Sequence, residues 1–98
     1  MEMICRLTVS GRVQGVGFRA WAEMTALELG VEGWVRNRRD GSVEILLVGP
    51  EELVLTMIEE CRKGPPGAHV EAIDQWDAGS EDLALRRPGE LFSVLPAS

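Results

Sequence analysis

The sequence predicts an α+β fold in which an antiparallel sheet carries two helices on one face. Three observations lead to this prediction. Apolar residues alternate with polar ones in several short stretches, they recur at helical spacing in two longer stretches, and Asp40-Gly41 marks a tight hairpin between two strands. The order of elements is β-α-β-β-α-β, followed by a short terminal strand. A chain of 98 residues with 45% hydrophobic content fits a single domain spanning residues 1–98.

The first half of the chain is predicted to form a strand, a helix and a second strand. In residues 3–10 every second side chain is apolar, which is typical of a strand with one buried face. Residues 19–29 continue an apolar series that begins at Phe18 and has the spacing of a helix stripe, and Gly30 ends that helix. Alternation returns in residues 31–37, which predicts the second strand.

The second half is predicted to add a strand, a helix and two further strands. The third strand covers residues 42–48, and a Gly-Pro pair followed by two glutamates begins a helix that a Gly-Pro-Pro-Gly run ends. Residues 70–76 form the fourth strand. Residues 77–90 are a polar loop without a clear pattern, and residues 91–95 form a short last strand.

Connection rules leave one main arrangement for this order of elements. Each helix is a right-handed crossover between parallel strands, and the hairpin makes the second and third strands antiparallel neighbours. The two β-α-β units then interleave into a ferredoxin-like two-layer sandwich. The third strand lies between the first two, so residues 3–10 and 31–37 run parallel and finish at the same end of the sheet. The loop after the first strand is therefore expected to lie close to Asn37.

Composition argues against several classes of partner. The chain has 10 Lys and Arg against 16 Asp and Glu, for a net charge of −6, whereas nucleic-acid binding favours a basic face. It has no apolar run near the ~20 residues that a membrane span needs, and no secretory signal at its start. We therefore expect a cytoplasmic monomer that acts on a small molecule, with neither nucleic acid nor membrane as a partner.

The cysteines and the single histidine are not expected to carry chemistry. Cys5 and Cys61 lack a C-x-x-C spacing and lie on apolar faces, which favours buried free thiols and leaves an internal disulfide as the alternative. His69 stands without convergent cysteines or carboxylates, so we expect no metal site. We expect no cofactor either.

A glycine-rich loop is the first candidate for a binding site. It runs from Ser10 to Arg19 (S-G-R-V-Q-G-V-G-F-R) between a predicted strand and a predicted helix. Glycines let successive backbone N–H groups turn toward one anion, the helix start adds partial positive charge, and Arg19 can grip two phosphate oxygens. A tight turn alone would also explain the glycines. The loop also matches the G-x-G-x-x-A dinucleotide fingerprint, but the early hairpin does not fit a dinucleotide domain.

Asn37, at the end of the second predicted strand, is the other candidate. An asparagine just before a turn is commonly a turn former. The predicted topology, however, places it opposite the glycine-rich loop, where its amide could orient a water molecule toward a bound phosphate.

Two segments of the chain resemble the signature segments of the acylphosphatases. They are G-R-V-Q-G-V-G-F-R at 11–19 and G-W-V-R-N-R-R-D-G-S-V-E at 33–44, and the matching order of elements extends the resemblance over nearly the whole chain. The resemblance implies a ferredoxin-like fold and hydrolysis of acyl phosphates to a carboxylate and inorganic phosphate, by water attack without a covalent intermediate. It also implies that Arg19 binds phosphate and that Asn37 orients water. The implied phosphate cradle is made by the loop amides around Gln14, Gly15, Val16, Gly17 and Phe18.

Two alternatives share the predicted fold. A non-catalytic ferredoxin-like module that binds an anion or a partner would not need Asn37 opposite Arg19. A domain that acts on carbamoyl phosphate in hydrogenase maturation would share both motifs. Such a domain belongs to a much larger polypeptide, so the length of this chain favours the stand-alone enzyme.

Overall fold

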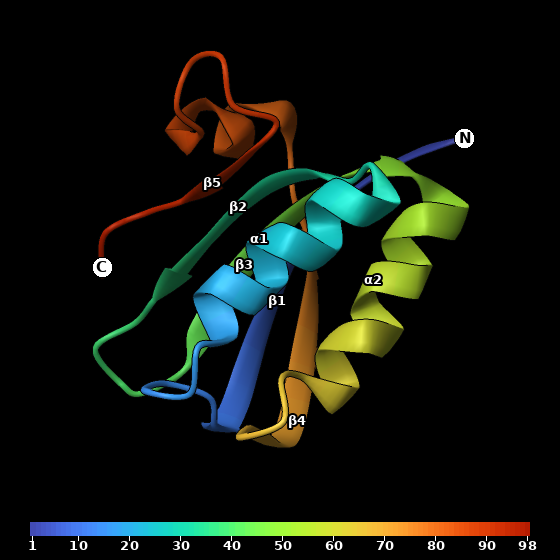
Figure 1. Cartoon of the computed structure of the whole chain (residues 1–98). Coiled ribbons are helices and arrows are strands. Elements are labelled where there is room, and N and C mark those ends of the chain that lie inside the picture. Colours follow the sequence, from blue (N-terminus) through green and yellow to red (C-terminus); the bar gives the residue numbers. More distant parts are fainter.

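The computed structural model describes all 98 residues, Met1 to Ser98, as a sheet covered by two helices (Figure 1). In chain order the elements are β1 (Glu2–Arg12), α1 (Phe18–Leu29), β2 (Glu32–Asn37), β3 (Val43–Pro50), α2 (Glu51–Lys63), β4 (His69–Asp77), the 3-10 helix η1 (Ser80–Leu85) and β5 (Phe92–Val94). This order confirms the predicted β-α-β-β-α-β series with a short terminal strand. Neither α-helix is long and apolar enough to span a membrane.

The five strands form one sheet in the order β4-β1-β3-β2-β5, and both α-helices cover the same face of it (Figure 1). β3 pairs antiparallel with β1 on one side and with β2 on the other. β1 and β2 therefore run parallel with one strand between them, as the sequence predicts. β1 also pairs antiparallel with β4. The predicted ferredoxin-like α+β sandwich is confirmed.

Two features of the C-terminal part differ from the prediction. The sheet is mixed rather than wholly antiparallel, because β5 pairs parallel with β2. The 77–90 segment, predicted as an irregular loop, contains the helix η1. Leu83 of η1 packs against a small apolar cluster around Trp34, and the Trp34 indole nitrogen donates to the Asp82 carbonyl at 2.8 Å. The parallel pairing of β5 and the helix η1 both depend on contacts with residues far away in the sequence, and local sequence patterns do not reveal such contacts.

The main core lies between the sheet and the two α-helices. α1 contributes Phe18, Ala22 and Ala26, which have the predicted helical spacing. β3 is buried from Val43 through Gly49, because the α-helices cover one of its faces, while a second apolar cluster and the arginines around Glu44 cover the other. Burial of this apolar surface is the main favourable term in folding, and it holds the carboxyl ends of β1 and β2 at one end of the sheet.

Both cysteines lie in this core as free thiols, so the alternative of an internal disulfide is not realised. Burial raises the pKa of Cys5 to about 11, with a smaller contribution from the negative charge of Asp77. Burial likewise raises the pKa of Cys61 to about 12, with smaller contributions from Glu60 and Cys5. Low polarity disfavours the charged thiolate, so both groups are protonated and unreactive at neutral pH.

Candidate functional site

The glycine-rich loop, the start of α1 and the end of β2 line one cavity of about 330 Å³, the only one in the molecule. Figure 1 shows the loop after β1 and the hairpin after β2 at the same end of the sheet. The structure therefore brings Asn37 and the loop together, as the topology predicts. The lining residues come from the loop, α1, β2 and β5, and they are Val13, Gln14, Gly15, Gly17, Phe18, Arg19, Ala20, Glu23, Asn37 and Val94.

The loop reaches the cavity through two glycines with left-handed backbone. Gly15 has a φ of 74° and Gly17 a φ of 79°, a region that other residues rarely adopt. Gly17 caps α1, and its carbonyl accepts the Trp21 amide at 3.0 Å. The first amides of an α-helix have no partner inside the helix, so those at the start of α1 remain available to an anion.

Arg19 is the second residue of α1, and its partly buried side chain lines the cavity. The guanidinium forms no ion pair with any acidic side chain of the protein. A free guanidinium at a helix N-terminus adds a full positive charge and a fork of donors to the partial charge of the helix. The cavity can therefore hold a phosphate-sized anion against the helix start.

Asn37 approaches the cavity from β2, of which it is the last residue. Its backbone is fixed, because it pairs with Val43 of β3 and its carbonyl accepts the Ser98 amide at 3.0 Å. Its carboxamide makes no hydrogen bond within the protein, unlike that of Gln14. The side chain thus offers one donor group and one acceptor to a water molecule or a ligand.

The other predicted loop residues contribute in different ways. Phe18 is buried and packs edge-on against Trp21, with ring centres 5.2 Å apart, so only its backbone can serve an anion. Val16 does not line the cavity and packs against the core instead. Gln14 lines the cavity, but its side-chain nitrogen is bonded to the hairpin between β2 and β3.

Four lining residues are not among the residues that the sequence predicts individually: Val13, which lies within the glycine-rich loop, and Ala20, Glu23 and Val94, which lie outside it. Glu23 could have been found, because it follows Arg19 by four positions and therefore lies on the same face of α1. Val94 could not, because its strand β5 reaches the site only through its parallel pairing with β2. Glu23 matters most for chemistry, since it places a negative charge in the wall of a cavity that otherwise favours anions.

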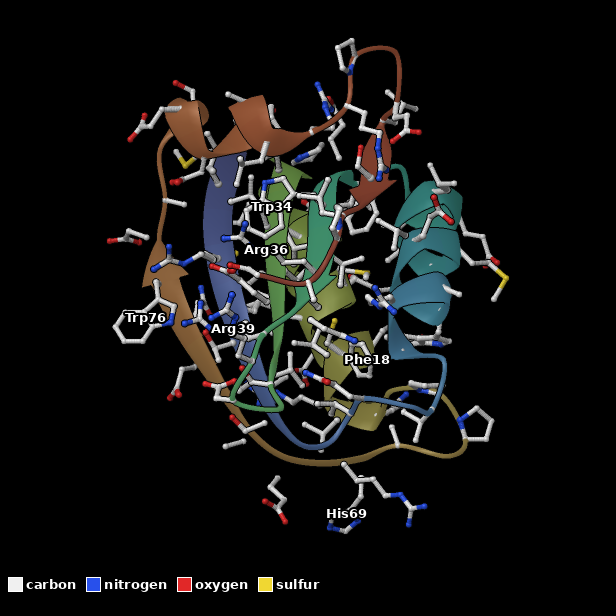
Figure 2. The ribbon with its side chains drawn as sticks, turned by 90° about the vertical axis from the view of Figure 1, so that its left-hand side faces the viewer. Phe18, Trp34, Arg36, Arg39, His69 and Trp76 are labelled. Carbon is white, nitrogen blue, oxygen red and sulfur yellow. The ribbon has the colours of Figure 1, made fainter.

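A buried carboxylate supports the hairpin from the sheet face that carries no α-helix. Glu44 of β3 is only 2% exposed and accepts a hydrogen bond from Arg36 Nε at 2.7 Å. Arg6 and Arg38 each place a guanidinium nitrogen 3.5 Å from the same carboxylate. Figure 2 shows Arg36 beside Trp34, and its guanidinium carbon lies 4.8 Å from the centre of the indole ring. Charge pairing thus reinforces the carboxyl end of β2.

The turn of the hairpin is held by Asp40. Its Oδ1 accepts the Ser42 hydroxyl at 2.6 Å and the Ser42 amide at 2.9 Å. These two bonds, the hydroxyl first, lower the pKa of the Asp40 carboxyl. The turn is therefore closed by a charged acceptor over the ordinary physiological range.

No histidine or cysteine lines the cavity. His69, the only histidine, lies at the exposed start of β4, and Figure 2 shows it at the periphery of the molecule. The protein has no group of three or more His, Cys, Asp or Glu side chains arranged to hold a metal ion.

Residues 5–84 match the family model described as Acylphosphatase. The acylphosphatase of Rhodopseudomonas palustris (strain BisB18) is 54% identical over 94 residues, which cover 96% of this chain and 95% of that protein. The crystal structure of acylphosphatase from Bacillus subtilis is similar with a TM-score of 0.82 and 38% identity, over 97% of this chain and 99% of that one. Full-length HypF in its phosphate- and nucleotide-bound form has a TM-score of 0.83 and 21% identity, with only 12% of its chain covered, and this likeness shows the fold alone.

Proposed function

The chain belongs to the acylphosphatase family, and on that premise we propose how it hydrolyses the carboxyl–phosphate bond of acyl phosphates. Arg19 and the amides of the glycine-rich loop bind the phosphoryl group, and Asn37 orients the attacking water. The products are a carboxylate and inorganic phosphate. One observation carries the proposal: a free guanidinium, a helix N-terminus and a free carboxamide line the same cavity.

Arg19 and the backbone amides of residues 14–18 form the proposed phosphate cradle. In phosphoryl transfer the negative charge spreads over the equatorial oxygens, and catalysis rests on positioning and electrostatic stabilisation. Donors that are fixed before the reaction stabilise this charge without reorganisation. The left-handed glycines and the start of α1 supply such fixed donors, and Arg19 adds the only free cation of the cavity wall.

Asn37 is proposed to place the water in line with the bond that breaks. As the water oxygen bonds to phosphorus, the bond from phosphorus to the acyl oxygen breaks and its electrons leave with the carboxylate. The proton of the water passes to a phosphoryl oxygen. A carboxylate is a weak base with a pKa of ~4, so the leaving group needs no general acid. The scheme uses no covalent intermediate, and it fits a cavity without histidine or cysteine.

Arg19→Lys tests the cradle. Lysine keeps the charge but loses the planar fork that grips two oxygens, so kcat/KM for acetyl phosphate should fall by roughly 100-fold or more, and inhibition by inorganic phosphate should weaken. Arg12→Lys, at the exposed end of β1 and outside the cavity, is the matched control and should keep the parent kinetics. Parent kinetics in a folded Arg19→Lys protein would remove Arg19 from the site.

Asn37→Ala tests the placement of water. We expect kcat to fall by about 100-fold, because the nucleophile is no longer oriented, while the inhibition constant of inorganic phosphate changes little. The two variants should therefore affect different parameters. A protein that keeps its kcat but loses phosphate affinity would make Asn37 a substrate-binding group instead.

Three further properties belong to the proposal: a single domain over residues 1–98, a monomeric state and a cytoplasmic location. Sedimentation at micromolar concentration should give the mass of one chain, 10.8 kDa, and kcat should not depend on protein concentration.

A further inference from the structure

The side chain of Gln14 joins the two halves of the cavity. Its Nε2 donates to the Arg38 carbonyl at 2.8 Å and to the Ser42 carbonyl at 2.8 Å. A carboxamide nitrogen has only two N–H groups, so both are used on the hairpin and neither is left for a bound phosphate. No other hydrogen bond connects residues 13–17 with residues 37–42.

The two carbonyls lie next to the end of β2. Arg38 directly follows Asn37, and Ser42 directly precedes Val43, the residue with which Asn37 pairs. The Arg38 amide also donates to the Ser42 carbonyl at 2.9 Å, which closes the hairpin. Gln14 therefore bonds to the two hairpin residues that adjoin the Asn37–Val43 pair on the side of the turn.

We propose that Gln14 is a positioning residue that sets the distance between the phosphate cradle and Asn37. The inference rests on the proposed function, because it assigns the phosphate to the loop and the water to Asn37. The loop residue that follows Gln14 is Gly15, the first left-handed glycine of the cradle. The backbone of Gln14 thus belongs to the phosphate cradle, and its side chain holds the hairpin that ends β2 at Asn37.

Without these two bonds, the tip of the hairpin has little to hold it against the loop. Residues 38–41 are exposed. Arg38 forms one ion pair within the turn, with Asp40, and one with Glu44 of β3, and neither pair reaches the loop. A small shift of the water relative to phosphorus is costly, since misplacement of reacting atoms by about 1 Å lowers rates by as much as 100-fold. Phosphate binding, in contrast, also uses Arg19 and the first amides of α1, which the helix itself holds in place.

Gln14→Met is the direct test, because methionine has a similar length and no hydrogen-bond donor. We expect kcat for acetyl phosphate to fall roughly 10- to 100-fold, with the inhibition constant of inorganic phosphate within about twofold of the parent. Gln14→Glu should lower kcat as well, since a carboxylate cannot donate to two carbonyls, but its negative charge in the cavity wall should in addition weaken inhibition by phosphate. Gln75→Met on exposed β4, the only other glutamine, is the matched control and should leave both parameters unchanged.

A double-mutant cycle separates positioning from a general loosening of the protein. In an Asn37→Ala background, Gln14→Met should lower kcat by less than about twofold further, because no oriented water remains to be displaced. Two results would overturn the inference: an undiminished effect in that background, or a loss of phosphate affinity with kcat preserved. If Gln14→Met does not fold by circular dichroism, the same cycle is run with Gln14→Glu.

The failure of this inference can be distinguished from failure of the proposed function. If Arg19→Lys and Asn37→Ala lose activity while Gln14→Met keeps the parent kcat, only the role of Gln14 is wrong. If Arg19→Lys and Asn37→Ala keep parent activity, the proposed site itself is wrong, and the positioning role falls with it.

Discussion

Replacing Glu44 with glutamine should destabilise the protein by removing the charge at the centre of three guanidinium groups. Glutamine has nearly the same shape, so the substitution leaves no cavity and changes charge alone. Arg36 is 22% exposed and its Nε lies 2.7 Å from the carboxylate. Arg6 and Arg38 are 39% and 43% exposed and lie 3.5 Å away. The cost should therefore come mainly from Arg36, because water screens the other two pairs.

The magnitude follows from these geometries. A hydrogen bond to a charged group contributes roughly 1.5–3 kcal/mol, and the neutral bond that glutamine can still make to Arg36 keeps about 1 kcal/mol of it. Each half-exposed pair adds about 0–1 kcal/mol. The net loss in the free energy of unfolding should be about 2 kcal/mol, which lowers Tm by about 8–16 °C for a domain of this size.

Urea unfolding followed by tryptophan fluorescence measures this loss, because Trp34 is buried beside Arg36. Glu59→Gln is the matched control: its ion pair with Arg62 is equally short, at 2.8 Å, but both side chains are more than half exposed. That variant should lose less than about 0.5 kcal/mol. If Glu44→Gln lost no more than Glu59→Gln, burial would not strengthen the Glu44 pairs and the reasoning would fail.

The kcat for an acyl phosphate should be nearly flat from about pH 6 to 8, because no histidine or cysteine lines the cavity. Parent and His69→Gln profiles should coincide once spontaneous hydrolysis and substrate ionisation are subtracted, and a bell present only in the parent would refute this. Glu23→Gln removes a negative charge from the cavity wall, so at low salt the kcat/KM for succinyl phosphate relative to acetyl phosphate should rise about two- to fivefold. Glu28→Gln, on the exposed part of α1, should leave that ratio unchanged, and equal ratios in both variants would exclude a role for Glu23 in selectivity. The raised pKa values of Cys5 and Cys61, about 11 and 12 against 9.0, disfavour thiolates in the folded state. Their contribution to stability is complete below pH 9 and is lost as the pH rises from 9 toward 12. The urea midpoint should fall in that window, and it should fall less when both cysteines are replaced by alanine.

The sequence predicts best those elements whose buried face gives a regular spacing of apolar residues, or whose ends carry recognisable residues such as Gly and Pro. α2 is one example: the expected start after Pro50 agrees with a helix that begins at Glu51. β5 is predicted only in part: a strand is expected at residues 91–95 and lies at Phe92–Val94, but no local pattern tells which strand it joins or in which direction. Its parallel pairing with β2 joins residues far apart in the chain, as do the contacts of Leu83 in η1 with the cluster around Trp34.

Some residues of the candidate site could likewise be predicted from the sequence, and others could not. Arg19 and Asn37 could be predicted because one adjoins glycines at a helix start and the other ends a strand whose place follows from topology. The bonds of Gln14 could not, because they require the hairpin carbonyls to lie within reach of the loop. Glu44 is similar: in an alternating strand it suggests a solvent-facing charge, whereas arginines from two neighbouring strands and the turn bury it.

The place of β1 between β4 and β3 governs how the enzyme becomes active as it folds. β1 pairs Glu2 with Pro50 and Cys5 with Asp77, so long segments of chain must close before the strand is held on either side. Folding through such distant pairs is slower than folding through local ones. The β2–β3 hairpin can form early, but the glycine-rich loop reaches it only when β1 pairs with β3. A chain in which this pairing is missing therefore has no working site, and during refolding the return of hydrolysis should report the pairing of β1 with β3 rather than the first collapse.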